Sequence, residues 1–282
     1  MRARPISDSD LSDSTPSRVI AVDWSGRRGS DQARHTWLCE IVDTAVRRLE
    51  CGRTRSELVD HLAEVAAGEP PVVIGLDFAF SMPEWYLRDR GISSGPELWE
   101  TVAREELTPG MRELGLAAWM QEPDRPFWRT RRPGGLTPER AFRRTELETR
   151  AMGTQPKSVF QLVGGGQVGR GSLYGMQALH ELERRGFSVW PFADADGPLV
   201  VEIFPRALTG AVVKSNPAAR AAFLEQLELR PADRVAAEAS EDAFDALLSA
   251  LAMARAGDAF DRLRMEPRYA LEGKIWAATR PG

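Results

Sequence analysis

Two stretches decide the fold: RVIAVD at residues 18–23 and PVVIGLD at residues 71–77. Each is a short apolar run that ends in a carboxylate, Asp23 in the first and Asp77 in the second. Continuous apolar runs of this length are typical of strands that are buried on both faces of a sheet. The pattern therefore predicts two core strands whose terminal aspartates lie at the edge of the sheet.

The residues between these runs predict a hairpin and a helix. HTWLCEIV at 35–42 and VRRLEC at 46–51 are two short strand candidates, joined by the turn residues 43–45. Thr54 and Glu57 then form a capping box before apolar residues at helical spacing, which indicates the start of a helix. The second core strand follows that helix.

A long insertion separates these elements from the rest of the sheet. Residues 81–157 carry several helix signals and no clear strand, which predicts a largely helical insertion. After it the order is helix, two strands and two helices, expected at about 172–185, 187–192, 199–204, 218–229 and 241–256. Residues 1–17 are rich in Ser, Asp and Pro and predict a disordered tail. We therefore expect an α/β fold, a mixed sheet flanked by helices, with residues 18–282 forming one domain.

The composition is that of a globular protein and excludes several other classes. Hydrophobic residues make up 43% of the 282 residues and charged residues 28%, which excludes a disordered chain or a collagen-like fibre. No run of about 18 apolar residues occurs, so no membrane partner is expected. The net charge of −4 gives no overall signal for nucleic acid. Cys39 and Cys51 cannot form a disulfide scaffold, and a reducing cytoplasm is the simplest location.

Acidic residues recur where a buried strand or an apolar helix does not need them. Glu202 lies inside a later expected strand, as Asp23 and Asp77 end the first two. Asp242 and Asp245 share one face of an Ala- and Leu-rich helix because they are three residues apart. Charged side chains are almost never fully buried unless they are paired or bind a metal. The sequence therefore predicts a carboxylate site.

Converging carboxylates can hold Mg²⁺ or Mn²⁺, because both ions prefer oxygen ligands. Two such ions roughly 3.5–4 Å apart would activate a water and stabilise the leaving oxygen in phosphodiester hydrolysis. Simpler roles stay open for single residues. Strand-end aspartates often cap turns, Asp242 is favoured near a helix N-terminus, and Glu202 is able to pair with an arginine such as Arg206.

The order of strand, hairpin, helix, strand, late strand and C-terminal helix, with acids at these positions, resembles the ribonuclease H-like fold. VIAVDWSG at 19–26 is similar to the first strand of that superfamily, and EDAFDALLSALAMA at 241–254 to the last helix of Holliday-junction resolvases. A closer resemblance is to an uncharacterised bacterial family of predicted RNase H-like nucleases. It spans about residues 18–276 and rests on VIGLDFAFSMP, GMQAL, VWPF, VEIFPRAL, DAFDALLSALAMA and LEGKIW, in this order.

The resemblance implies a divalent-metal-dependent nuclease in which Asp23 bridges two ions. Asp77 and Glu202 would complete the ligand shell from neighbouring strands, and Asp245 would join it from the last helix. These four residues would be catalytic, and Asp242 would be a second helix ligand or an orienting neighbour. Two other classes stay open. One is a nucleotide-binding protein or phosphotransferase of the actin-like ATPase or sugar-kinase type, and the other is a non-catalytic RNase H-like binding module.

Residues 164–169 read GGGQVG and match the dinucleotide-binding pattern GxGxxG. They follow the strand-like run SVFQLV at 158–163 and precede a helix and a strand that is followed by acidic residues. This arrangement predicts, as a less favoured alternative, a dinucleotide-binding oxidoreductase. A flexible glycine loop, or a substrate-phosphate loop flanked by Lys157 and Arg170, are two further interpretations.

Basic residues gather between positions 125 and 144, with Phe127 and Trp128 interleaved. The pattern is typical of a surface that follows a nucleic-acid backbone and stacks on a base, and a solvated face of an arginine-rich protein produces it too. In FRRTE at 142–146, one arginine would position a phosphate or pair with Glu202. Nucleic acid or a nucleotide is therefore the expected partner, and the candidate substrate-binding residues are Arg129, Arg131, Arg132, Arg144, Lys157 and Arg170. The three histidines, His35, His61 and His180, show no metal-ligand spacing.

Overall fold

The computed structural model describes residues 18–104, 126–129, 131–163, 168–209 and 212–277. The predicted tail at 1–17 lies outside the described residues, as do most of the glycine-rich segment and part of the predicted insertion. In the described parts of the chain, no helix is long and apolar enough to cross a membrane.

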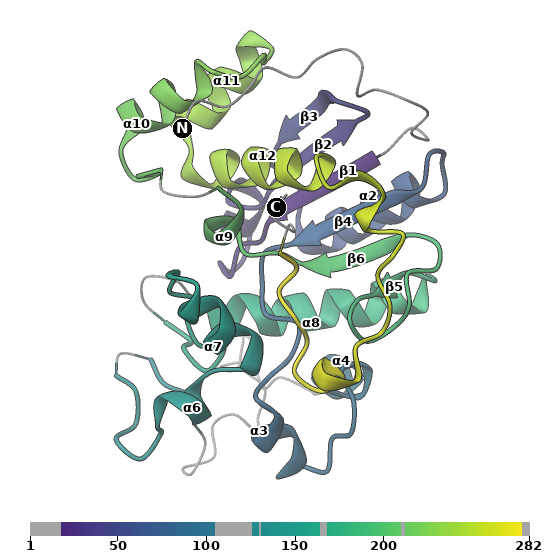
Figure 1. The fold of residues 1–282 in the computed structure, drawn as a ribbon, viewed down its shortest axis with the longest axis vertical. Helices are drawn as coiled ribbons and strands as arrows, with labels where there is room; N and C mark the ends of the chain where they lie inside the picture. The colour runs from purple at the N-terminus through teal and green to yellow at the C-terminus, as the bar shows by residue number, and fades with distance from the viewer. Residues whose placement is uncertain (1–17, 105–125, 130, 164–167, 210–211, 278–282) are drawn as a thin grey trace.

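A mixed six-stranded sheet forms the centre of the molecule (Figure 1). The strand order is β3-β2-β1-β4-β6-β5. The pairs β1–β2 and β2–β3 are antiparallel, whereas β4 runs parallel to β1, β6 to β4 and β5 to β6. The bounds are β1 Arg18–Asp23, β2 Trp37–Val42, β3 Ala45–Glu50, β4 Val72–Leu76, β5 Ser188–Val189 and β6 Leu199–Glu202.

Both faces of this sheet are buried under helices. Because side chains alternate along a strand, Val19 and Ala21 of β1 pack into one core and Ile20 and Val22 into the other. Helix α12 (Glu241–Ala254) covers the first face, together with α11 (Pro231–Ala239). Helices α2 (Arg55–Ala66) and α8 (Val168–Arg184) cover the second. The result is a three-layer α/β structure, as the apolar runs predicted.

Helix α12 approaches the sheet closely, because small residues line its contact face. Gly75 in β4 lies directly beneath it: a Cβ at this position would stand 2.6 Å from Met253 Sδ and 2.8 Å from Ile203 Cγ2. The helix begins at an N-cap where Ser240 Oγ accepts a hydrogen bond from the Ala243 amide, at 3.2 Å. The glycine lets the C-terminal part of α12 approach β4, and the cap fixes where the helix begins.

The insertion contains short helices, and the described part of it forms no named strand. These helices lie together beyond α8, away from the sheet (Figure 1). Their bounds are α3 Glu84–Arg88, α4 Gly95–Arg104, α6 Pro138–Ala141 and α7 Arg144–Ala151. The remaining helices are α1 Asp31–Arg34, α9 Pro205–Thr209 and α10 Pro217–Leu224, with 3-10 turns at Gly257–Ala259 and Pro267–Tyr269.

The local sequence signals were accurate at the start of the chain and weaker later. The predicted capping box is present, since Thr54 Oγ1 accepts from the Glu57 amide and the Glu57 carboxylate accepts from the Thr54 amide. The strand predicted at 187–192 shrinks to the two residues of β5. Residues 158–163 form no strand and only one isolated bridge, between Trp128 and Gln161. The strand that a dinucleotide-binding unit needs before its glycine loop is therefore not formed.

Candidate functional site

Asp23 and Asp77 stand side by side at the ends of adjacent parallel strands. Val22 pairs with Leu76 across β1 and β4, so the next residues, Asp23 and Asp77, are neighbours in the same register. The Asp77 amide donates a hydrogen bond to the Val22 carbonyl at 3.0 Å, which continues the ladder one residue beyond β4. By alternation, both aspartates share the face of Ala21 and Gly75, the face that α12 covers.

Asp245 reaches this place from α12. It lies in the second turn of the helix and its side chain is buried, with 2% of the residue exposed. Oδ2 accepts a hydrogen bond from Lys214 Nζ. Oδ1 is buried and has no hydrogen-bond partner among the described residues. A buried carboxylate oxygen without a partner is costly, so this atom is available to accept a hydrogen bond or to bind a cation.

Asp242 lies one turn before Asp245 and completes a group of four carboxylates, which we name the carboxylate cluster: Asp23, Asp77, Asp242 and Asp245. Asp242 is half-exposed, and its Oδ2 lies 3.2 Å from His35 Nδ1. His35 follows α1 and also approaches the Asp31 carboxylate, at 3.7 Å. The cluster therefore contacts a histidine through Asp242 and a lysine through Asp245.

The carboxylate cluster holds more negative charge than its surroundings neutralise. Burial and the neighbouring Asp77, Asp242 and Asp245 hold the pKa of Asp23 well above its ordinary value, and Lys214 only partly opposes them. Burial, Asp245, Glu202 and Asp242 raise the pKa of Asp77 to about 8, again against Lys214. Burial likewise raises the pKa of Asp245. Strongly perturbed carboxylates in a cavity are typical of functional sites.

Glu202 points to the opposite face of the sheet. Val201 and Ile203 pack in the core under α12, whereas Val200, two residues before Glu202, packs in the core on the side of α8. Glu202 therefore faces away from α12. Arg143 clamps it there: Nη1 donates to Oε2 at 2.8 Å and Nη2 to Oε1 at 2.5 Å. The Phe80 amide donates to Oε2 as well, at 2.9 Å.

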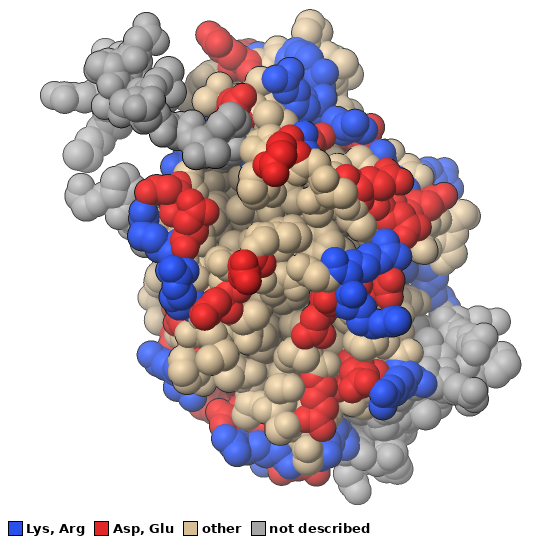
Figure 2. Space-filling view, turned by 90° about the vertical axis from the view of Figure 1, so that its right-hand side faces the viewer, with Lys and Arg blue, Asp and Glu red and all other residues tan. Residues whose placement is uncertain are grey.

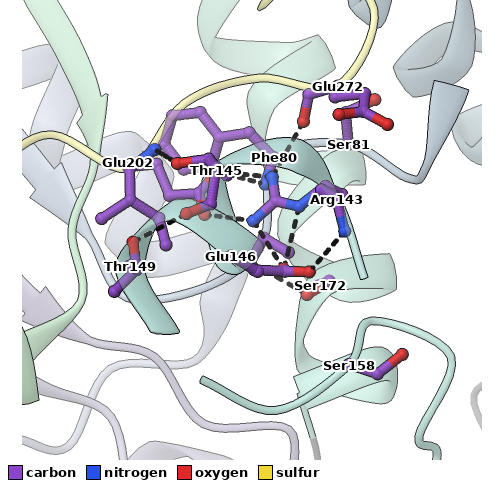
Figure 3. Close-up of polar contacts among 12 residues, drawn as sticks. Phe80, Ser81, Arg143, Thr145, Glu146, Thr149, Ser158, Ser172, Glu202 and Glu272 are labelled. Atoms are coloured by element: carbon purple, nitrogen blue, oxygen red, sulfur yellow. Dashed lines mark hydrogen bonds and ion pairs between the residues drawn. The ribbon is translucent and has the colours of Figure 1, made fainter. Parts of the chain in front are cut away.

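Arg143 connects Glu202 to the start of α7 and to the C-terminal segment (Figure 3). Its Nε donates to Glu146 Oε1 at 2.9 Å and its Nη1 to the Glu272 carbonyl at 3.0 Å. Only 1% of Arg143 and 2% of Glu146 and of Glu202 is exposed. Burial opposes the charged form of Arg143, but the two glutamates raise its pKa above the ordinary value. The prediction that an arginine of FRRTE pairs with Glu202 is confirmed, and the partner is not Arg206, whose Nη1 donates to the Val212 carbonyl.

A cavity of about 710 Å³ lies over these groups, and we name it the acidic cavity. The carboxylate cluster, Lys214, Lys157 and the Arg143–Glu202 pair all line it. Loops after the strands form the rest of the wall. Arg55 Nη2 donates to the Ser25 carbonyl at 2.7 Å and Arg170 Nε to the Gly26 carbonyl at 2.6 Å, and both contacts hold the turn after β1. All five acids predicted for the site therefore line one cavity, with Glu202 bound differently from the rest.

The predicted substrate-binding residues divide into three groups. Lys157 lines the acidic cavity, and Arg132 lines a smaller cavity beside it. Arg170 supports the turn after β1. Arg144 does not line the acidic cavity, and its amide donates a hydrogen bond of 2.7 Å to Glu272 Oε2. The third group is exposed and lines neither cavity: Arg129 and Arg131.

Two residues of the site had no signal in the sequence. Lys214 lies in the segment between α9 and α10, and His35 follows a four-residue helix. Neither belongs to a motif, and each reaches the cluster through a contact between segments far apart in the chain, 31 residues for Lys214 and 207 for His35. The chain has three lysines, Lys157, Lys214 and Lys274, and nothing in their number singles out Lys214.

The donor set fits a hard divalent cation, although the site is not preformed for one. Carboxylate oxygens are the ligands that Mg²⁺ and Mn²⁺ prefer, and Asp245 Oδ1 is an acceptor without a partner. In the described residues, no three His, Cys, Asp or Glu side chains form a ready-made metal site. The ammonium group of Lys214 provides a positive charge at Asp245 instead. A bound cation would have to share or take over that place.

Comparisons of the chain with models of known protein families, with curated proteins and with solved structures find no match.

Proposed function

We propose that the protein is a divalent-metal-dependent phosphodiesterase that acts on nucleic acid, built on a ribonuclease H-like sheet. The observation that carries the proposal is the meeting of Asp23 and Asp77, at the ends of adjacent parallel strands, with a buried Asp245 whose Oδ1 has no described partner. A structural role alone does not account for three neighbouring carboxylates with raised pKa values.

The architecture supports this reading. A hairpin precedes a helix and a parallel strand, then a late parallel strand and a closing helix that covers the sheet, which is the order on which the resemblance rests. The acids come from β1, from the residue after β4 and from the closing helix. Fold alone does not establish function, so the proposal depends on the cluster and not on the sheet.

Within the proposal, each residue has a defined task. Asp23, Asp77 and Asp245 hold the cation. Asp242 is the orienting neighbour, and its own carboxylate contacts His35. Glu202 is left out of the ligand set, because Arg143 and the Phe80 amide already occupy its oxygens; it fixes the loop after β4. Lys157, on the cavity wall, binds a substrate phosphate. When bound, the cation would activate water and stabilise the leaving oxygen of the phosphodiester.

One observation favours a second candidate, a nucleotide-binding module without metal chemistry. Lys214 already neutralises Asp245, and no ready-made metal site exists in the described residues. In this case the lysine would be a permanent counter-ion and the cavity would bind a nucleotide without cleaving it.

Cleavage assays with purified protein separate the two candidates. Labelled single-stranded and double-stranded DNA and RNA are incubated with Mn²⁺, with Mg²⁺ or with EDTA. The proposal expects cleavage in the presence of metal, its loss with EDTA and its loss in Asp77→Asn. Asp43→Asn is the matched control, because Asp43 lies exposed in the β2–β3 turn at a φ of 58° that Asn adopts readily. Binding of these ligands without cleavage under any metal would favour the second candidate.

A further inference from the structure

A second cavity, of about 270 Å³, lies beside the acidic cavity, and we name it the side cavity. It is lined by two aromatic residues, three basic residues and a short polar segment: Trp128, Phe142, Arg132, Arg150, Lys157, Gln155, Pro156, Ser158 and Gln161. Gln155, Pro156 and Lys157 also line the acidic cavity. The two cavities therefore share one wall, and a ligand that crosses it passes Lys157.

The walls of the side cavity are held in place by hydrogen bonds to backbone carbonyls. The Trp128 amide donates to the Phe160 carbonyl at 3.0 Å, and the Leu162 amide donates to the Trp128 carbonyl at 2.8 Å. Ser158 Oγ donates to the Ala141 carbonyl at 2.5 Å, which ties the shared wall to α6. Trp128 and Phe142 are partly buried and pack against the core on the α8 side of the sheet. The aromatic surfaces are thus positioned before any ligand arrives.

The charge lining the side cavity has one sign. Arg132, Arg150 and Lys157 are exposed, and none of them forms an ion pair with another described residue. Arg150 lies over the Phe142 ring, with its Cζ 4.4 Å from the centroid. Glu139 is near enough for Arg132 to help lower its pKa, but the two do not form an ion pair and Glu139 does not line the cavity. The cavity is therefore suited to an anion with an aromatic part.

This lining differs from the face of the molecule that Figure 2 shows. On the face shown in Figure 2, acidic and basic side chains are interspersed, and neither sign gathers into one patch. The overall charge is −4. Three basic side chains without an ion pair to any described residue, around two aromatic residues, are thus a local feature and not a consequence of a basic protein.

We propose that the side cavity binds the nucleotide next to the scissile phosphodiester, so that the substrate is a single-stranded oligonucleotide. The base stacks on Trp128, and the phosphate that joins the two nucleotides lies at Lys157 on the shared wall. Stacking on aromatic side chains beside basic residues is how proteins bind single strands without reading their sequence. The volume of about 270 Å³ is just below the roughly 300–1,000 Å³ of drug-sized ligand sites, so the side cavity is sized for one small ligand group. The inference rests on the proposed function, because the carboxylate cluster defines which phosphate is scissile.

Binding measured without metal tests this subsite independently of catalysis. Fluorescein-labelled dT and rU oligonucleotides of one, two, four and eight nucleotides are titrated with protein in EDTA, and fluorescence anisotropy is recorded. We expect the affinity to rise from one to two nucleotides, and a preference for the single strand over the matching duplex. Comparison of the dT and rU oligonucleotides shows whether the side cavity binds DNA or RNA more tightly.

The variants are chosen to separate stacking, charge and folding. Trp128→Ala should weaken binding by roughly 5- to 150-fold, the effect of losing one base stack, and Trp128→Tyr should restore most of it. Affinity falls as salt rises, so the slope of log affinity against log salt is negative. Lys157→Gln should make this slope less steep by about 0.7, the value for one phosphate contact on a single strand. Arg47→Gln is the control, because Arg47 is exposed on β3 and lines neither cavity. Lys157 is exposed, so Lys157→Gln is expected to fold. It therefore still tests the subsite if Trp128→Ala unfolds.

The outcomes distinguish the subsite from the proposed function. Weaker binding in Trp128→Ala and a reduced slope in Lys157→Gln, with no Mn²⁺ binding by the wild type, would keep the subsite and remove the nuclease. Mn²⁺ binding with unchanged oligonucleotide affinity in both variants would remove the subsite and keep the nuclease. An absence of oligonucleotide binding by the wild type at low salt would also overturn the subsite.

Discussion

Lys214 donates a hydrogen bond from Nζ to Asp245 Oδ2, while the other oxygen of the same carboxylate is buried without a described partner. The lysine side chain is 38% exposed and the aspartate side chain only 3%. The partner that satisfies Asp245 thus belongs to a half-exposed segment, and the acid itself is fixed in α12. An ammonium group placed in this way is able to leave the cluster when a stronger cation arrives.

The first prediction follows from this competition. In Lys214→Met, a divalent cation no longer displaces an ammonium group, so Mn²⁺ should bind roughly 10- to 100-fold more tightly, the equivalent of a charged hydrogen bond of about 1.5–3 kcal/mol. The metal-free protein should melt at a lower temperature, because Asp245 loses its counter-ion. Lys274→Met is the control, since Lys274 pairs with Glu266 at 2.8 Å, outside the acidic cavity. Equal or weaker Mn²⁺ affinity in Lys214→Met would show that the lysine does not compete with metal.

The second prediction concerns pH. The pKa of Asp77 is about 8 in the folded protein and about 3.9 in the unfolded chain, so the folded state binds more protons between these values. Stability that this group contributes is present at low pH and is lost as the pH rises from about 4 to 8. Melting temperatures of the wild type and Asp77→Asn in EDTA should therefore diverge over this range, with the variant gaining relative stability toward pH 8. Parallel curves would contradict the raised pKa.

The third prediction tests the clamp on Glu202. Arg143→Ala leaves Glu146 and Glu202 buried without their cation, which should cost about 3–5 kcal/mol in the free energy of unfolding, measured with urea. Arg144→Ala is the matched neighbour: its side chain is 40% exposed and its nearest carboxylate, on Glu84, is 3.8 Å away. That variant should change stability by less than about 0.5 kcal/mol. Similar losses in both would mean that the buried network does not hold the insertion to the sheet.

The fourth prediction concerns the height of α12 above the sheet. Gly75→Ala places a Cβ against Met253 and Ile203, so the helix must shift or the side chains must leave their rotamers. We expect a loss of about 1–3 kcal/mol from overpacking, together with weaker Mn²⁺ binding because Asp245 moves with the helix. Gly134→Ala is the control, because nothing lies within 4 Å of a Cβ at that position. Unchanged Mn²⁺ affinity in Gly75→Ala would show that Asp245 does not depend on this contact.

Much of the central sheet was predictable because its strands are marked by apolar runs in the local sequence. The apolar runs that end in Asp23 and Asp77 became β1 and β4, and the Ala- and Leu-rich segment at 241–254 became α12. The face of Glu202 was not predictable in the same way. Residues on both faces of β6 are apolar, since both faces are buried, so the alternation of side chains leaves no polar side to read.

Lys214 and Arg143 differ in how far local sequence patterns could predict their contacts. Pairing of one arginine of FRRTE with Glu202 was one of two roles expected from the sequence, and the structure shows that this arginine is Arg143. Lys214 reaches Asp245 from a segment with no periodicity of its own, and only the folded chain brings them together. Contacts that depend on long-range packing of irregular segments carry no local signal, so the counter-ion of the cluster had to come from the structure.

The most direct test of the account is a calorimetric titration of the metal-free protein with Mn²⁺. The wild type and the Asp43→Asn control should bind the ion, and Asp23→Asn should not, because the amide keeps the size of the side chain and removes the charge that the cation needs. A parallel melt should show Asp23→Asn at least as stable as the wild type in EDTA, since the substitution relieves repulsion with Asp77, Asp242 and Asp245. No heat of binding from the wild type into the millimolar range, or equal binding by Asp23→Asn, would contradict the claim that this cluster is a metal site.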